Sequence, residues 1–333
     1  MKIGLVTWIG GPDDAKFVAE AERLGVDSVW TAEAWGYDAL TPLAYAAAGT
    51  TRIRLGSGIA QLGARSPAML AMSALALQGL SDGRFILGVG VSGPQVMEGW
   101  HGSRFTTPVQ RTRETIEIVR TIARGERLAY DGEVYKLPLP DGPGRALRSF
   151  APPAEIPIWV ASLGPRNLRL TGEVADGWIG QAVVPETASV FTRHLAVGAK
   201  TGGRSLADLE LSATASLELS DEVDEVAKRH ARGYAFTIGA MGTADANFYN
   251  DAFSRQGFGD DVQAVQRLWL DGRREEARDR VPVDLALKTN LLGTPEMVKE
   301  RVRLYREAGF TTIRVQTTDL DALAQLLDLV ADL

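Results

Sequence analysis

The sequence predicts an α/β fold, a (β/α)8 TIM barrel with insertions. Short apolar runs alternate with helix-like segments from the N-terminus onward, and this alternation requires a mainly parallel sheet. The apolar runs number eight, near residues 3, 28, 55, 88, 158, 178, 213 and 313, which is the strand number of this barrel. Such barrels often exceed about 250 residues, so we expect the 333 residues to form one domain, 1–333.

Four strand–helix pairs fill the first part of the chain. The first helix is expected because Ala15, Val18, Ala21 and Leu24 recur at the spacing of one helical face, and the other segments follow the same patterns. The expected pairs are Lys2–Trp8 with Asp13–Leu24, Asp27–Thr31 with Pro42–Gly49, Ile53–Ile59 with Pro67–Leu80, and Phe85–Val91 with Pro108–Ile122.

The second part of the chain repeats the pattern with two interruptions. Five prolines between Lys136 and Glu155 predict a loop, and a charged segment at about 221–290 predicts a helical elaboration of the barrel. The remaining strands are expected at Ile156–Ser162, Gly177–Ile179, Leu209–Leu219 and Thr311–Gln316, and the helices at Pro165–Val174, Pro295–Ala308 and Leu320–Leu333.

Four helices are expected to begin in the same way. A hydroxyl residue at the N-cap precedes a proline at the first helical position, where the hydroxyl accepts a free backbone N–H and proline presets φ. These pairs are Thr41-Pro42, Ser66-Pro67, Thr107-Pro108 and Thr294-Pro295.

Composition excludes several kinds of chemistry. The formal net charge of −6 argues against nucleic-acid and anionic membrane partners. The absence of cysteine excludes disulfides, thiolate metal sites and a cysteine nucleophile, and three histidines, His101, His194 and His230, make a histidine metal site improbable. We therefore expect no metal. The N-terminus goes from one lysine directly into a strand and lacks the layout of a signal peptide, so a cytoplasmic location is expected.

A glycine motif follows the fourth strand. Gly88-Val-Gly90-Val-Ser92-Gly93 spells G-x-G-x-x-G, which in another context marks a dinucleotide-binding Rossmann unit. Here no long helix follows, and the motif lies in the fourth strand–helix unit. Two interpretations stay open: the motif is a plain glycine turn, or it is a loop whose free N–H groups contact a ligand.

Three further segments lie where strands end. Ser162-Leu163-Gly164-Pro165-Arg166 begins a helix whose free N–H groups suit an anion, although a plain strand–helix connection is the alternative. Gly56-Ser57-Gly58-Ile59 closes the third strand and permits either unusual backbone or a simple packing bend. Glu33 and Tyr37 follow the second strand with Trp35 and Asp38, and a carboxylate beside aromatics could serve acid–base chemistry or be a structural charge.

These segments resemble the luciferase-like monooxygenase superfamily, in its branch that uses the deazaflavin coenzyme F420. The likeness runs nearly end to end. It is carried by Val26–Tyr45, Phe85–Gly102, Ile156–Ile179, Ala246–Phe258 and Leu291–Val302.

The resemblance implies that the deazaflavin ring lies at the C-terminal mouth of the barrel. The ring would rest on a bulge after the third strand that often carries a non-proline cis peptide, which here is expected at Gly58–Ile59. The resemblance also implies that the loop with Ser92 and Gly93 bonds the ring. The segment Ser162, Leu163, Gly164 and Pro165 would receive the cofactor phosphate.

The chain departs from some relatives in its acid–base groups. Where they place a catalytic histidine after the second strand, this chain has Ala34 after Glu33, and where they have a first-strand glutamate it offers Val6 and Thr7. The candidates for proton transfer are Glu33, Tyr37, Gln95 and Glu98.

We expect an F420-dependent oxidoreductase that moves a hydride between the deazaflavin C5 and a small organic substrate, reducing a C=C or C=N bond, as a homodimer. The alternatives are an FMN-dependent monooxygenase of the same superfamily and a non-catalytic flavin or deazaflavin carrier. A dehydrogenase binding NAD at Gly88–Gly93 is a more distant one. Trp8, Trp35 and Trp100 could line an apolar pocket over the ring or be ordinary packing residues.

Overall fold

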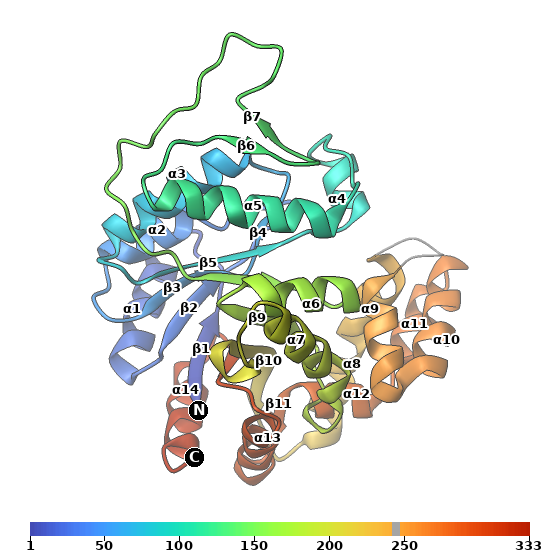
Figure 1. The fold of residues 1–333 in the computed structure, drawn as a ribbon. Helices are drawn as coiled ribbons and strands as arrows, with labels where there is room; N and C mark the ends of the chain where they lie inside the picture. Colours follow the sequence, from blue (N-terminus) through green and yellow to red (C-terminus); the bar gives the residue numbers. More distant parts are fainter. Residues whose placement is uncertain (242–246) are drawn as a thin grey trace.

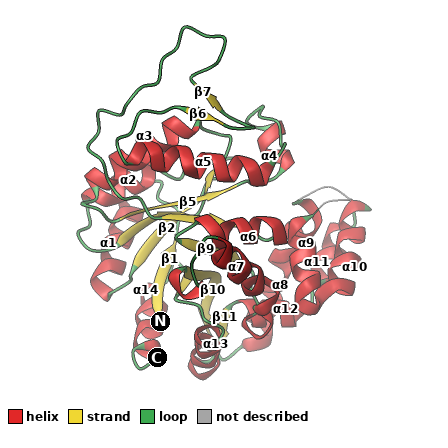
Figure 2. Ribbon diagram, viewed as in Figure 1, coloured by secondary structure: helices red, strands yellow, loops and turns green. Residues whose placement is uncertain are grey.

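A computed structural model of the chain describes residues 1–241 and 247–333 (Figures 1 and 2). Eight parallel strands close into a barrel in the order β1, β2, β3, β5, β8, β9, β10, β12, and β12 pairs with β1 again. These eight strands coincide with the eight predicted runs. The prediction of a TIM barrel is therefore confirmed, and the Rossmann alternative for the glycine motif is wrong because that fold is an open sheet.

Most predicted elements are present, with boundaries shifted by one to a few residues. The barrel strands are β1 (Lys2–Val6), β2 (Ser28–Thr31), β3 (Arg54–Ser57), β5 (Phe85–Gly90), β8 (Ile158–Ala161), β9 (Gly177–Gln181), β10 (Glu210–Leu219) and β12 (Thr312–Gln316). The helices around them are α1 (Pro12–Leu24), α2 (Thr41–Ala48), α3 (Pro67–Leu80), α4 (Pro94–Gly99), α5 (Pro108–Ala123), α6 (Pro165–Val174), α7 (Ser189–Thr201), α13 (Pro295–Glu307) and α14 (Leu320–Val330).

The sequence prediction omitted helices α4 and α7 and four short strands. β4 (Ala60–Gln61) continues β3 after a break, β11 (Leu291–Gly293) adds to β10 outside the barrel, and β6 (Tyr130–Asp131) pairs with β7 (Lys136–Leu137) in a small hairpin before the proline-rich loop. That loop projects beyond α3 and α5 (Figure 1). Between β10 and β11 lie α8 (Val223–Ala240), α9 (Phe248–Phe253), α10 (Gly259–Leu270), α11 (Arg274–Arg280) and α12 (Val283–Thr289). Residues 242–246, inside the expected helical elaboration and including Ala246 of the family likeness, lie outside the described residues.

Two of the four predicted hydroxyl caps are wrong. Ser66 and Thr294 accept the N–H of the residue three positions on, as expected. Thr107 makes no such bond because its backbone is left-handed, with φ of 46°. Before α2 the carboxylate of Asp38 accepts the N–H groups of Leu40 and Thr41 at 2.9 Å, so Thr41 is already the first helical residue.

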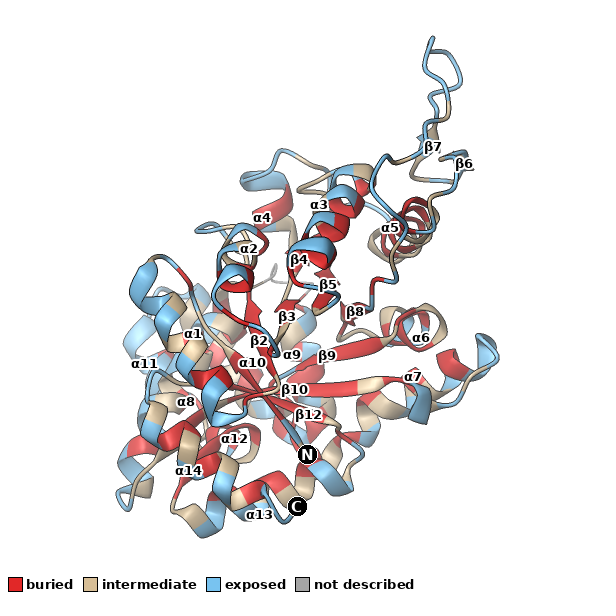
Figure 3. Ribbon diagram, turned by 90° about the vertical axis from the view of Figure 1, so that its left-hand side faces the viewer, coloured by how far each residue is buried: buried red, intermediate tan, exposed pale blue. Residues whose placement is uncertain are grey.

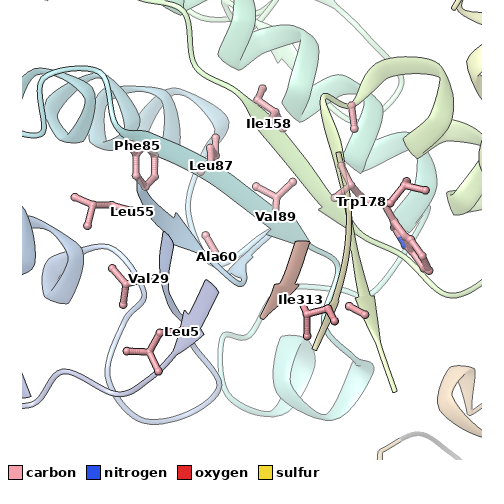
Figure 4. Close-up of a cluster of buried hydrophobic side chains, with 14 of the residues drawn as sticks. Leu5, Val29, Leu55, Ala60, Phe85, Leu87, Val89, Ile158, Trp178 and Ile313 are labelled. Carbon is pink, nitrogen blue, oxygen red and sulfur yellow. The ribbon is translucent and has the colours of Figure 1, made fainter. Parts of the chain in front are cut away.

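The main apolar core lies between the barrel and its helices. Outward-facing strand residues such as Leu5, Val29, Leu55 and Leu87 are buried there against the helices (Figures 3 and 4). Inward-facing residues alternate with them, as the period of a strand requires.

Two tryptophans fill the barrel interior. Trp30 on β2 and Trp159 on β8 come from strands that are not neighbours, yet their ring centroids lie 4.9 Å apart. Glycines on adjacent strands make room for them: a Cβ on Gly56 would lie 2.3 Å from the Trp30 ring, and one on Gly177 would lie 2.6 Å from the Trp159 ring. Each tryptophan thus lies beside a glycine on the next strand, and this combination of large and small residues keeps the barrel interior packed.

The N-terminal end of the barrel is closed by ion pairs. Arg54 binds Asp27 at 2.6 Å and Glu210 at 3.0 Å, and Lys2 binds the second oxygen of Glu210 at 3.1 Å. These side chains are 24–46% exposed, and each charge among them has a partner. Among the described residues no helix is long and apolar enough to cross a membrane.

Candidate active site at the barrel mouth

The predicted site residues follow four strands that are consecutive in the barrel. Glu33 and Tyr37 follow β2, Gly58 and Ile59 follow β3, the Ser92–Glu98 segment follows β5, and Ser162–Pro165 follows β8. β2 pairs with β3, β3 with β5, and β5 with β8. Because neighbouring strands lie about 4.8 Å apart, the structure brings these segments together on one arc of the C-terminal rim.

The break between β3 and β4 forms the expected bulge. The Gly58–Ile59 peptide bond is cis, which confirms that prediction. The Ser57 hydroxyl fills the interrupted ladder, since its Oγ lies 2.8 Å from Gly88 O and 2.9 Å from Gly88 N. A Cβ on Gly88 would lie 1.8 Å from Ser57 O. The glycine at the start of the G-x-G-x-x-G motif is thus needed for packing against the bulge.

The loop after β5 presents its backbone to the rim. Ser92 has a left-handed conformation with φ of 57°, and Gly93 caps the six-residue helix α4. Two catalytic candidates lie on that helix. Gln95 is exposed, and exposed Glu98 accepts the N–H of Phe105 at 2.9 Å.

The start of α6 is open. Gly164 is the N-cap with free space where a Cβ would stand, and Pro165 is the first helical residue. The next N–H groups have no intrahelical partner because they begin the helix. The Ser162 side chain, in contrast, turns inward and pairs with Thr171 Oγ1 at 2.8 Å. Only Leu163–Pro165 of the predicted segment present backbone at the helix start.

Arg255 is a residue that sequence reasoning missed at this end of the site. Its Nη2 donates to Leu163 O at 2.7 Å, and its guanidinium lies 5.4 Å from the Phe191 ring centroid. Its Nη1 is buried without a hydrogen-bond partner, and so is Oδ1 of Asn167 in α6. Burial and the charge of Arg193 lower the pKa of Arg255, although Asp251 opposes them. A cation with an unused donor beside a helix N-terminus suits an anion.

Glu33 is held tightly by its neighbours. One carboxylate oxygen accepts the N–H of Gln61 and Nη1 of Arg65, each at 2.6 Å, and the other accepts the N–H of Ala39 at 3.0 Å. Its side chain is 8% exposed. This carboxylate connects the loop after β2 to the strand that follows the bulge, because Gln61 lies two residues after Ile59.

A histidine reaches the same place from another loop. His101 Nε2 lies 2.8 Å from Gln61 Oε1, and Gln61 Nε2 donates to the carbonyls of Glu33 and Ala34 at 3.0 and 3.2 Å. Gln61 thus offers its oxygen to His101, so Nε2 is the donor of this hydrogen bond and Nδ1 takes no part in it. His101 is therefore two hydrogen bonds from Ala34, where some relatives carry a histidine. The spacing of 67 residues hid this proximity.

Exposed aromatic residues surround the mouth. Trp8, Trp35, Tyr37 and Trp100 follow β1, β2 and β5, and each is more than half exposed, unlike the buried Trp30. Tyr37 packs against Gly10, where a Cβ would lie 3.1 Å from its ring. These side chains offer apolar surface on the rim. Among the described residues no group of three or more His, Cys, Asp or Glu side chains could hold a metal ion.

Comparison with known proteins places this chain in a family. The model of the luciferase-like monooxygenase family matches residues 13–312. A Mycobacterium tuberculosis protein named "Putative coenzyme F420-dependent oxidoreductase" is 39% identical over 343 residues, 99% of both chains. The 5,10-methylenetetrahydromethanopterin reductase of Archaeoglobus fulgidus is 27% identical over 89% of this chain and 87% of its own.

Solved structures share the fold over the whole chain. The coenzyme F420-dependent tetrahydromethanopterin reductase of Methanopyrus kandleri has a TM-score of 0.80 at 22% identity, covering 98% of this chain and 96% of that one. An F420-dependent secondary alcohol dehydrogenase has a TM-score of 0.79 at 17% identity, covering 99% and 98%. The predicted family is confirmed, and the chain belongs to the luciferase-like monooxygenase family.

Proposed function

We propose that this protein is an F420-dependent oxidoreductase that reduces a C=C or C=N bond of a small organic substrate. The observation that carries the proposal is the continuous arc formed by the Gly58–Ile59 bulge, the Ser92–Gly93 loop and the open start of α6. It offers a backbone surface for a flat ring at one end and an anion site at the other. The relative with 39% identity over the full length is named for the same cofactor.

The residues on this arc fit a phosphate-bearing deazaflavin. The bulge, Ser92 and Gly93 would hold the ring, and Leu163, Gly164 and Pro165 with Arg255 would hold the phosphate. The fit rests on the buried unused donor of Arg255, which needs an acceptor. When bound, the deazaflavin supplies hydride chemistry at C5, while the protein supplies orientation and exclusion of water.

Reduction of a double bond also requires a proton, and we propose that His101 handles it. The predicted candidates are less suited by their contacts: Glu33 has both oxygens engaged, and Glu98 holds the Phe105 amide. Tyr37 and Gln95 remain candidates for positioning the substrate at the rim. His101 is exposed and is held through Nε2, so its Nδ1 can take up a proton from solvent and then donate that proton to the substrate.

Cofactor titration tests the proposal directly. The purified protein is expected to bind F420 at micromolar concentration and to bind FMN more weakly. Selective binding of FMN, with oxygen consumption in the presence of reduced FMN, would instead establish the monooxygenase alternative. His101→Asn should lower kcat for enones or imines about 10²-fold and leave F420 affinity unchanged. Tight F420 binding without turnover on enones, imines or alcohols would favour the carrier alternative.

We further propose that the protein is a homodimer through α2 and α3. Tyr45 on α2 and Met69, Met72 and Leu80 on α3 are each at least half exposed, and α3 carries no charged residue. A helix that is apolar on all sides is normally covered. Light scattering should give a dimer, and Met72→Glu should yield monomers, whereas a monomeric wild-type protein would contradict the proposal.

A further inference from the structure

A buried arginine without an acidic partner lies inside the barrel near its mouth. Arg314 on β12 is 2% exposed. Its Nη2 donates to Thr214 Oγ1 at 2.6 Å and lies 3.4 Å from Gly180 O. Its guanidinium lies 5.1 Å from the centroid of the Trp30 ring, and its Nε has no hydrogen-bond partner. Throughout the described ranges, 1–241 and 247–333, no carboxylate forms an ion pair with it.

The other arginine of the barrel interior shows what a structural pair looks like in this fold. Arg54, at the closed end, binds Asp27 and Glu210 at 2.6 and 3.0 Å. Hydrogen bonds to these carboxylates raise the pKa of Arg54 despite its burial. Arg314 receives no such compensation, so the two arginines differ in kind.

An unpaired buried cation is unfavourable for the folded state. Moving a charge out of water is unfavourable, and neutral oxygens and one aromatic face recover only part of that loss. Burial lowers the pKa of Arg314 to about 9, which still leaves the side chain charged at neutral pH. The protein therefore keeps a cation that does not serve its stability.

The guanidinium lies directly against the predicted seat of the ring. A Cβ on Gly58 would stand 3.0 Å from Arg314 Nη1, so the guanidinium occupies the space on that side of Gly58. The adjoining interior residues toward the mouth, Val6, Ile59 and Ala161, are only partly buried. Arg314 thus lies one layer below the surface on which a ligand would rest.

We propose that Arg314 binds a negatively charged or negatively polarised oxygen of the ligand at the barrel mouth. The ligand then supplies the partner that the chain does not provide. The proposal deepens the proposed function and rests on it in one respect, the placement of the deazaflavin at the Gly58–Ile59 bulge. The oxygen has two possible sources: the pyrimidine edge of the deazaflavin, which gains negative charge on reduction, or a carboxylate or enolate group of the substrate.

The test compares Arg314→Met and Arg314→Lys with the matched control Arg54→Met. Melting temperatures are measured without ligand. Affinities are measured anaerobically by calorimetry for two probes. The first is the riboflavin-like deazaflavin that lacks the phosphate tail, oxidised and reduced, so that Arg255 and α6 do not contribute. The second is benzoate, added to protein saturated with oxidised F420.

Arg314→Met should melt at or above the wild-type temperature because it removes an unpaired charge, whereas Arg54→Met should melt lower because Asp27 and Glu210 lose their cation. A tenfold or greater loss of affinity for the reduced ring alone identifies the cofactor as the source of the oxygen, and a similar loss for benzoate identifies the substrate. Arg314→Lys should retain part of that affinity.

Two results would overturn the proposal. One is unchanged affinity of Arg314→Met for both probes, and the other is a fall in its melting temperature as large as that of Arg54→Met. If the wild-type protein binds no deazaflavin, the proposed function fails. The melting comparison and a benzoate titration of the free protein then still decide whether Arg314 is an anion-binding residue.

Discussion

Replacing Glu33 with glutamine separates a structural carboxylate from a catalytic one. The carboxylate accepts three donors, the N–H groups of Gln61 and Ala39 and the guanidinium of Arg65. Glutamine keeps one acceptor oxygen and sets an NH2 group against at least one of these donors. Losing a charge-assisted hydrogen bond costs about 1.5–3 kcal/mol and an unsatisfied buried group about 1–3 kcal/mol, so we expect a loss of about 3 kcal/mol, somewhat reduced because Arg65 also lies 3.5 Å from Asp38.

Urea unfolding of Glu33→Gln measures this loss, with Glu98→Gln as the matched control. Glu98 is exposed and accepts one backbone N–H, so its substitution should change the free energy of unfolding by less than about 1 kcal/mol. Because Gln61 follows the bulge, Glu33→Gln should also weaken F420 binding. A variant with wild-type stability and affinity but kcat reduced 10²-fold or more would refute this reasoning and make Glu33 a proton-transfer residue.

Three further substitutions test the packing, the acid response and the anion site. Gly56→Ala should destabilise the protein by about 1–3 kcal/mol in chemical unfolding, because its Cβ would meet the Trp30 ring at 2.3 Å; an unchanged midpoint would contradict the packing described. At Glu114, burial raises the pKa, but hydrogen bonds from Gln110, Tyr135, Val134 and Glu133 outweigh it, so the pKa is lowered. Its stabilisation is thus present above the unfolded pKa near 4.3 and lost as pH falls. Glu114→Gln should cost about 2–4 kcal/mol at pH 7, and the difference from wild type should shrink below pH 4 in unfolding curves. Arg255→Met should bind F420 about tenfold more weakly and the tail-less deazaflavin equally well, and equal losses for both would place Arg255 elsewhere in the site.

The fold was predictable because periodicity is a local signal. Each barrel strand and most helices repeat an apolar pattern that neighbouring residues reveal. The failures came where the backbone conformation of one residue decides, or where an element is too short to show a period. Thr107 fails as a cap because its backbone is left-handed, and β11 was missed because three residues carry no readable period.

The site was predictable only in its backbone. Glycines and strand ends located the bulge and the start of α6, since these depend on short segments. Contacts between distant segments were not readable: His101 and Ala34 meet through Gln61, and Arg255 reaches Leu163 across 92 residues. Glu33 was a reasonable acid candidate, and the three donors that favour a structural role for it are contacts that the sequence does not reveal.

The pairing of charged side chains differs between the closed end of the barrel and its mouth. At the closed end Arg54, Asp27, Glu210 and Lys2 form ion pairs with one another. Removing any of them takes an ion-pair partner from another charge and should lower the stability of the fold. At the mouth Arg314 and Arg255 keep unused donors. Removing Arg314 should therefore not destabilise the free protein, and removing either arginine should weaken its complexes. Binding of an anionic ligand should therefore stabilise the wild-type protein more than a variant without these donors.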